Sequence, residues 1–234
     1  MFDKRLRPDV EQRLRPVGAN LRKAGLTADH LTLLGVVMAC GAAVAIGAGW
    51  LTVGFVLLVL TAVPDVLDGA VAKASGTASP RGAFFDSVSD RVTDALLLGG
   101  IAWYLSSTHP GRIAVLPLAV LAMSMLISYE RAKAEALGFD AKGGLMERAE
   151  RIIAIGLSLL FPVLMIPILW LTLVLTTVTA AQRFAKVWAQ ASNPRLATKE
   201  PTRWRTRRAT SPERSRARRE RWNQTREERR RSAR

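Results

Sequence analysis

Hydrophobic residues fill the middle of the chain in long runs, whereas charged residues gather at its two ends and in a few short connections. The apolar runs occupy residues 31–181. The first extends from about Leu31 to Gly49, and a helix of about 20 apolar residues is long enough to cross the core of a bilayer. The pattern therefore predicts an all-α integral membrane protein.

Interruptions in the apolar pattern divide it into six expected transmembrane helices. The second span begins near Leu51 and the third begins near Gly82. The fourth covers about residues 113–129. The apolar residues 152–181 are too many for one straight span, and Pro162 and Pro167 interrupt them. We therefore expect a fifth and a sixth helix joined by a tight turn that contains proline.

Between the fourth and fifth helices the sequence predicts a charged connection over residues 130–151. Its basic residues and expected turn points are Arg131, Lys133, Lys142, Arg148 and Arg151, with Gly138, Gly143 and Gly144.

Both ends of the chain are basic. In residues 1–25 the apolar positions recur at roughly helical intervals, which predicts a cytoplasmic amphipathic helix at the membrane interface, followed by a transmembrane domain over residues 26–191. The expected tail, residues 192–234, carries most of the chain's net charge of +15, because Pro194 onward holds sixteen Lys or Arg and five Glu. It has little apolar surface to bury, so we expect a disordered cytoplasmic tail. For this tail, contact with anionic membrane lipids, or a role only in setting the membrane topology, is favoured over binding to nucleic acid.

The basic residues also predict an orientation. They crowd the N-terminus, the 73–81 loop, the 130–151 connection and the tail, whereas the other three turns contain only Arg112. With six spans, the positive-inside rule places both termini on the cytoplasmic side of the cell (plasma) membrane.

Four aspartates interrupt the apolar pattern of the second and third helices. Asp65 and Asp68 are three residues apart, and Asp86 and Asp90 are four apart, so each pair shares a helix face. A carboxylate at mid-bilayer costs about 2.5–3.5 kcal/mol, so the four need a counter-charge. A cluster of carboxylates suits Mg²⁺, Mn²⁺ or Ca²⁺. The alternative is a set of solvated aspartates at helix ends, but the recurrence of the spacing in adjacent segments favours a metal site.

Small residues, Gly69, Ala72 and Gly82, stand among the acids and permit close approach of a helix or a phosphate. The whole pattern, Asp-x2-Asp-Gly-x2-Ala-x9-Gly-x3-Asp-x3-Asp, resembles the signature of the CDP-alcohol phosphotransferase family. Lys73 stands where the family usually has Arg. Lysine keeps the positive charge there and lacks the bidentate fork.

This resemblance implies transfer of a phosphatidyl group from CDP-diacylglycerol to an alcohol, with CMP as the leaving group. It implies that Asp65, Asp68, Asp86 and Asp90 hold two Mg²⁺ or Mn²⁺ ions and that Asp90 is also the catalytic base. The residues expected to bind CDP-diacylglycerol are Asp29, Asp65, Asp68, Gly69, Ala72, Lys73 and Gly82. At Ala28-Asp29 the family more often has Pro-Asn. The resemblance also implies a homodimer, for which Gly99 and Gly100 would permit close approach.

Five basic residues near the cytoplasmic ends of the last three helices suit a phosphate on the acceptor: Arg131, Lys133, Arg148, Arg151 and Arg183. They could instead serve only to keep these helix ends on the cytoplasmic side, as the positive-inside rule describes. Because all five are expected at the same depth in the membrane, a pocket is favoured. Residues 128–136 and 143–151 resemble the corresponding stretches of actinobacterial phosphatidylinositol phosphate synthases, which implies inositol phosphate as the acceptor.

Two other functions remain open from the sequence. Phosphatidylglycerophosphate synthase shares the aspartate motif and also needs a phosphate-binding acceptor pocket, with glycerol 3-phosphate as substrate. Buried carboxylates also line the pathways of metal-ion and proton transporters. A transporter would spread its acids through the depth of the bundle, whereas here both aspartate pairs are expected near one membrane face.

Overall fold

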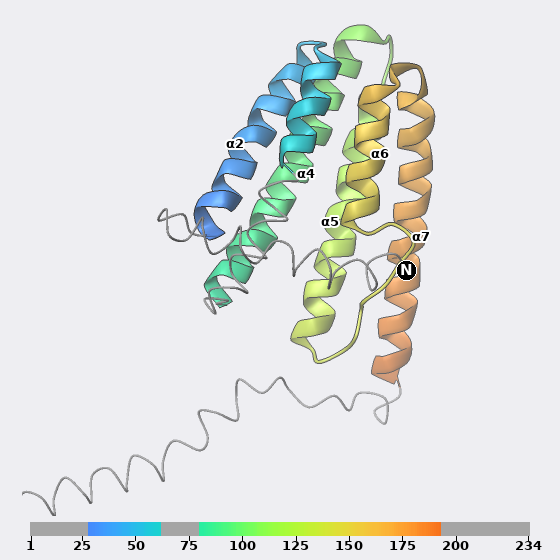
Figure 1. The fold of residues 1–234 in the computed structure, drawn as a ribbon. Coiled ribbons are helices and arrows are strands. Elements are labelled where there is room, and N and C mark those ends of the chain that lie inside the picture. Colours follow the sequence, from blue (N-terminus) through green and yellow to red (C-terminus); the bar gives the residue numbers. More distant parts are fainter. Residues whose placement is uncertain (1–27, 62–79, 193–234) are drawn as a thin grey trace, which may run out of the picture.

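The computed structural model describes residues 28–61 and 80–192, and within these two ranges the chain is helical and contains no strand (Figure 1). Its elements are α2 (Ala28–Gly47), the helix Leu51–Thr61, α4 (Pro80–Thr108), α5 (Val115–Ala136), α6 (Arg148–Leu160), the 3-10 turn η1 (Pro162–Leu164) and α7 (Met165–Ser192). The expected all-α fold is confirmed. The amphipathic helix over 1–25, nearly all of the tail, and Asp65, Asp68, Gly69, Ala72 and Lys73 lie outside the described residues.

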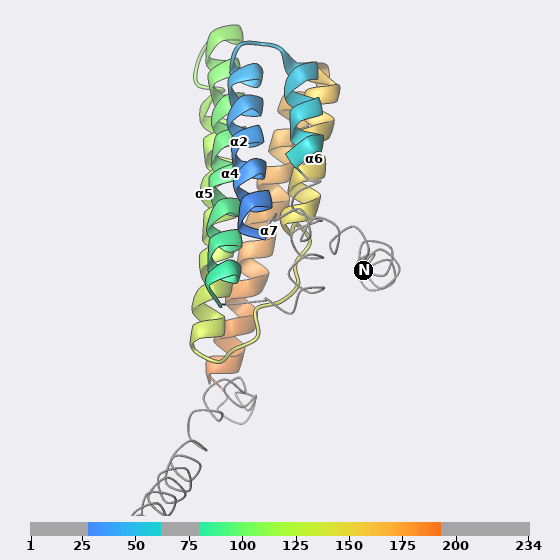
Figure 2. The same ribbon diagram turned by 60° about the vertical axis from the view of Figure 1, so that its left-hand side comes forward.

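The helices stand side by side and alternate in direction along the chain (Figures 1 and 2). Helix α2 packs against α4, α4 against α5, and α7 against both α5 and α6. The turns 47–51, 108–115 and 160–165 lie at one end of the bundle. The starts of α2, α4 and α6 and the ends of α5 and α7 therefore point to the other end, which we call the site end.

Within residues 28–61 and 80–192, three helices are long and apolar enough to cross a membrane: Asp29–Gly47, Val115–Ala136 and Pro162–Ser192. Helices α4 and α6 do not meet this requirement of length and apolar composition, each for a different reason. Helix α4 has 29 residues but carries several charges in its first half, and α6 has only 13 residues. The structure is thus consistent with a membrane protein, whereas the expected count of six transmembrane helices is not confirmed.

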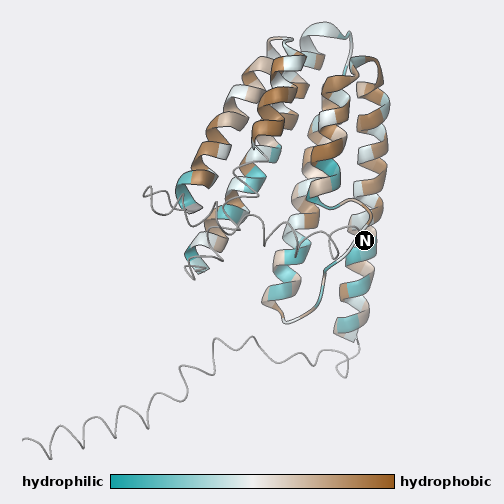
Figure 3. Cartoon of the chain, in the orientation of Figure 1, coloured by the Kyte–Doolittle hydropathy of each residue, from teal (hydrophilic) through white to brown (hydrophobic). Residues whose placement is uncertain are grey.

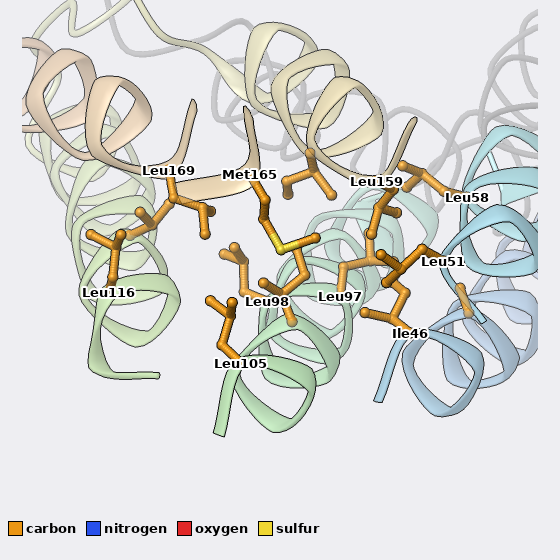
Figure 4. Close-up of a cluster of buried hydrophobic side chains, with 14 residues drawn as sticks. Ile46, Leu51, Leu58, Leu97, Leu98, Leu105, Leu116, Leu159, Met165 and Leu169 are labelled. Atoms are coloured by element: carbon orange, nitrogen blue, oxygen red, sulfur yellow. The ribbon is translucent and has the colours of Figure 1, made fainter. Parts of the chain in front are cut away.

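The main cluster of buried hydrophobic residues lies in the half of the bundle away from the site end, and the lower parts of α4, α5 and α7 are the more hydrophilic ones (Figure 3). In α4 the fully buried side chains Leu97, Leu98, Ile101 and Leu105 recur on one helical face. They meet Met165 and other buried side chains of the last two helices in a single cluster (Figure 4). This core fixes the helices that carry the polar residues of the site end.

A glycine allows α2 and α4 to approach closely. A Cβ added at Gly100 would lie 2.6 Å from the carbonyl oxygen of Ala43 and 2.9 Å from its Cα. At the neighbouring Gly99, nothing lies within 4 Å of an added Cβ. Of the two glycines expected to permit close helix approach, Gly100 therefore serves packing within one chain.

The expected boundary of the fourth helix is wrong. Helix α5 continues past Tyr129 to Ala136, so Arg131 and Lys133 lie on a helix and not in a connection. The residues after Tyr129 are mostly Ala, Arg, Lys and Glu, which favour helix, and Arg131 pairs with Glu135 one turn later at 3.1 Å. Charge in this segment therefore extends the helix beyond its apolar part.

The fifth helix also begins earlier than expected, at Arg148 instead of Ile152. Glu147 is its N-cap, and Glu150 accepts a hydrogen bond from the backbone N–H of Glu147 at 3.1 Å. Both arginines of this segment therefore lie in the first turns of α6.

The expected turns on either side of α6 are confirmed. Gly138, Gly143 and Gly144 all have positive φ. The Pro-containing turn is η1, which begins at Pro162. Pro167 does not break the chain, because it lies in the first turn of α7, where its missing N–H would have no helical partner.

Gly100→Ala should destabilise the bundle by about 1–3 kcal/mol, because the new methyl group overpacks the contact with Ala43. Gly99→Ala is the matched control and should leave the Tm unchanged or raise it, since alanine favours a helix by about 1 kcal/mol over glycine. Thermal unfolding of the purified protein in detergent compares the two, and equal Tm values would contradict the assignment of Gly100.

Candidate active site

The alternating helices bring nearly all predicted site residues in the described ranges to the site end of the bundle. Asp29, Gly82, Asp86 and Asp90 lie in the first half of α2 or α4. The basic residues lie at the end of α5, the start of α6 and the last third of α7. Residues far apart in the sequence therefore share one polar region (Figure 3).

Asp86 and Asp90 lie one turn apart on the same face of α4, and both are half-buried. Among the residues of the two described ranges, no three side chains of His, Cys, Asp or Glu come together in a way that could hold a metal ion. The other two aspartates of the predicted metal site, Asp65 and Asp68, lie outside those ranges. The prediction of a four-aspartate metal site therefore stays a prediction.

Asp90 faces a pair of arginines. Its Oδ1 lies 3.0 Å from Nη2 of Arg148, and its Oδ2 lies 3.4 Å from Nη1 of Arg91. The Asp90 side chain is 18% exposed to solvent. The proposed base on α4 is thus in contact with a residue of the predicted acceptor-phosphate pocket on α6.

Asp94 continues the aspartate row one turn further along α4 and was not identified from the sequence. Its Oδ2 lies 2.9 Å from Nη2 of Arg151, and the two side chains are only 6% and 5% exposed. Breaking such a buried pair by removing one partner costs about 3–5 kcal/mol. The four-residue spacing of Asp86, Asp90 and Asp94 was the available signal, because it places all three on one face of α4.

Arg183, on α7, is bound by three segments at once. Its Nη1 donates to the carbonyl oxygen of Ile127 on α5 at 3.1 Å, and its Nε donates to the carbonyl oxygen of Gly143 at 3.0 Å. Its Nη2 lies 3.2 Å from Oε1 of Glu147. The Arg183 side chain is 5% exposed. This arginine therefore anchors the connection between α5 and α6 to α7.

The predicted basic residues differ in their surroundings. Arg151 and Arg183 are buried, Arg148 is half-buried, and Arg131 and Lys133 are exposed on α5. Arg131 and Arg151 are both close enough to Arg183 to repel it electrostatically. Lys133 lies in the last turn of α5. The structure thus buries or half-buries the arginines of α6 and α7, while the two basic residues of α5 are exposed.

The connection 137–147 between α5 and α6 is held along its length by a stripe of polar residues on α7. These residues are Thr179, Arg183, Lys186 and Gln190. Their hydrogen-bond partners in the connection are, respectively, Met146, Gly143, Lys142 and Asp140. Spacings of four, three and four residues keep the stripe on one face of α7, so the connection follows the helix.

Asp29 lies in the first turn of α2 and forms an exposed ion pair with Arg81 of α4 at 3.5 Å. Gly82, one residue after Arg81, is half-buried in the first turn of α4. These two predicted nucleotide contacts therefore come from neighbouring helices and lie near each other at the site end.

Comparison with known proteins identifies the family. Residues 25–181 match the family model for CDP-alcohol phosphatidyltransferase, which is well over half of the chain. The chain belongs to this family. The matched residues include the whole aspartate motif and both arginines of α6. The resemblance inferred from the motif is therefore confirmed, and this CDP-alcohol phosphatidyltransferase is an enzyme of phospholipid biosynthesis.

Several known relatives make inositol phosphate lipids. The phosphatidylinositol phosphate synthase of Streptomyces avermitilis is 34% identical over 85% of this chain and 87% of its own length. That of Corynebacterium glutamicum is 38% identical over 62% of this chain and 69% of its own length. The archaetidylinositol phosphate synthase of Methanothermobacter thermautotrophicus is 37% identical over 64% of this chain and 72% of its own length.

Solved structures show the same architecture. The phosphatidylinositol phosphate synthase of Mycobacterium tuberculosis with CDP-DAG bound is 31% identical, with a TM-score of 0.70 over 75% of this chain and 93% of that one. A second structure of that enzyme, in complex with manganese and citrate, has the same identity and TM-score over 75% of this chain and 88% of that one. The manganese complex points to the use of a divalent metal in this family.

The hold of α7 on the connection can be tested at Asp140. The backbone N–H of Lys142 donates to the Asp140 carboxylate and lowers the pKa of that group below its usual value; burial opposes this shift and Lys186 adds to it. Because the folded-state pKa is depressed, the stabilisation is present above the unfolded pKa of about 3.9 and is lost as the pH falls through the lower folded value.

At pH 7, Asp140→Asn should therefore speed amide hydrogen exchange across residues 138–146, because it removes the charge that holds Lys142 and Lys186. In the wild type, the protection of these amides relative to their intrinsic exchange rate at each pH should fall to the level of the variant only in strong acid. Glu135→Gln is the matched control, since it removes the carboxylate of an exposed ion pair within α5. Equal exchange in Asp140→Asn and wild type at pH 7 would show that this carboxylate does not hold the connection.

Proposed function

We propose that this protein transfers the phosphatidyl group of CDP-diacylglycerol to inositol phosphate, giving phosphatidylinositol phosphate and CMP. The observation that carries the proposal is the group of arginines at the site end, Arg148, Arg151 and Arg183, beside the aspartate row of α4. The names of the relatives support the same acceptor.

The proposed metal ligands are Asp65, Asp68, Asp86 and Asp90, holding two ions of Mg²⁺ or Mn²⁺. The two described members fit this role, because their hard oxygen donors lie one turn apart on one face of α4. When bound, the ions would neutralise the diphosphate and stabilise the negative charge that moves to the leaving group.

Asp90 is the proposed base. Its carboxylate accepts the proton of the acceptor hydroxyl as the hydroxyl oxygen attacks the phosphorus of the phosphatidyl group. The bond from that phosphorus to the CMP oxygen breaks, and CMP leaves with the electron pair. Since Arg148 contacts Asp90 at 3.0 Å, the same guanidinium adjoins the base and the proposed acceptor pocket.

The acceptor phosphate is proposed to bind Arg148, Arg151 and Arg183, with Arg131 and Lys133 at the rim. A guanidinium presents five N–H donors, so an arginine that binds a carboxylate through one nitrogen can also bind a phosphate. The unreactive phosphate would then orient the inositol ring toward Asp90.

The proposed contacts to CDP-diacylglycerol come from α2, α4 and the segment between residues 62 and 79. They are Asp29, Asp65, Asp68, Gly69, Ala72, Lys73 and Gly82. Gly82 lies at the start of α4, one turn before Asp86, where the absence of a side chain would let the diphosphate approach the helix.

We further propose that both termini and the site end face the cytoplasm, as supported by the basic residues of that end. The proposed division of the chain is an amphipathic helix over 1–25, the transmembrane catalytic domain over 26–191 and a lipid-facing basic tail over 192–234. A homodimer is proposed from family resemblance, with Gly99 available at the surface of α4.

CMP release from membranes supplied with CDP-diacylglycerol tests the acceptor. Inositol phosphate should give a kcat/KM at least about tenfold above that of free inositol, because a charge-assisted hydrogen bond to the phosphate contributes about 1.5–3 kcal/mol. Glycerol 3-phosphate is the comparison that keeps a phosphate on a smaller alcohol. A higher kcat/KM for glycerol 3-phosphate would overturn the proposal and indicate a phosphatidylglycerophosphate synthase.

Asp86→Asn should lower the rate of CMP release by about 10²–10³-fold, the scale expected when a group that stabilises moving charge is lost. It should also weaken Mn²⁺ binding measured by titration calorimetry, because a neutral amide does not balance the ion. Glu213→Gln, which removes a carboxylate outside the residues that match the family model, is the control. Unchanged Mn²⁺ binding by the Asp86 variant would remove that residue from the metal site.

A further inference from the structure

The aspartate row of α4 extends one turn beyond the two members that belong to the family motif. Asp94 follows Asp90 by four residues, and its Oδ2 lies 2.9 Å from Nη2 of Arg151. Its Oδ1 faces Nε of Arg148 at 4.0 Å, while Arg148 also lies 3.0 Å from Asp90. Asp94 is therefore linked to both arginines of α6, and through one of them to the proposed base.

The two helices keep these pairs in register. Both α4 and α6 begin at the site end and run in the same direction (Figure 1). Arg148 therefore lies level with Asp90, and Arg151, three residues later, lies level with Asp94. Two carboxylates on one helix face two guanidinium groups on the other.

Stability alone explains the Asp94–Arg151 pair poorly. A buried ion pair often stabilises a fold no more than apolar residues of the same size, and an apolar core begins only three residues further along α4, at Leu97. Arg151 is also close enough to Arg183 to be repelled by it. The carboxylate of Asp94, 2.9 Å from Nη2 of Arg151, supplies the opposite charge beside this buried guanidinium.

We propose that Asp94 is a positioning residue for the acceptor phosphate. It fixes the guanidinium of Arg151 and shares Arg148 with Asp90, so that both arginines are in place before the acceptor binds. This assignment rests on the proposed function and adds a residue outside the family motif to it. Asp94 does not touch the reacting atoms, so its removal should change acceptor binding and leave donor binding intact.

Asp94→Asn tests the assignment in the full-length protein. The KM for inositol phosphate should rise by about tenfold or more, the scale of a charge-assisted contact to a phosphate. The KM for CDP-diacylglycerol should stay within about twofold of the wild-type value, a limit well below one such contact. Gly100→Ala is the matched control, because it strains the same helix through Ala43 and touches none of these ion pairs, and it should leave both KM values unchanged.

A double-mutant cycle shows whether Asp94 acts through Arg151. Arg151→Gln alone should raise the acceptor KM, and adding Asp94→Asn to it should raise that KM little further, because the partner is already gone. Should Asp94→Asn fail to fold, Asp94→Glu replaces it. The longer side chain keeps the charge but displaces the guanidinium, so the same split between the two KM values is expected.

An unchanged acceptor KM in the folded Asp94 variants would overturn the assignment, as would an equal rise in both KM values or full additivity with Arg151→Gln. Failure of the proposed function has a different signature. The wild-type protein would then release no CMP in response to inositol phosphate, whereas failure of the Asp94 assignment alone leaves wild-type activity intact and the variants indistinguishable from it.

Discussion

Charged side chains inside a bundle of apolar helices must be neutralised by one another, and here that requirement joins α4 to α6. The backbones of these two helices do not pack as closely as those of the other described neighbours, such as α2 and α4. The long side chains of Arg148 and Arg151 reach across to Asp90 and Asp94 instead. The position of the site thus depends on side-chain length and charge, while the apolar core beyond it fixes the helices.

A second set of polar contacts fixes the connection before α6. One face of α7 binds this connection at four levels, and Arg183 also reaches α5. The connection therefore contributes ordered backbone carbonyls and Glu147 to the site end. A helix that looks from its hydropathy like a simple membrane anchor thus organises part of the polar region with one of its faces.

The sequence predicted the helical class, the Pro-containing turn before α7 and the shared face of Asp86 and Asp90, because these follow from local period and spacing. It placed the end of α5 and the start of α6 wrongly, since apolar runs mark membrane depth and not helix ends. Asp94 and Glu147 were missed as partners for a different reason. Which acid meets which arginine depends on the register between helices, and a single sequence does not contain that information directly.

The shortness of α6 has a consequence for how a lipid substrate reaches the proposed active site. Thirteen residues of helix extend about 20 Å, which is roughly 10 Å less than the hydrocarbon thickness of a bilayer. Its far end adjoins the start of α7, which is 28 residues long, so the first turn of α6 stops short of the level where α7 ends (Figure 1). Drawing an acyl chain out of the membrane costs about 0.8 kcal/mol for each methylene group. A reaction centre recessed to this depth would let a two-chain donor react with its chains still in the bilayer, and only the water-soluble acceptor would need to travel inward.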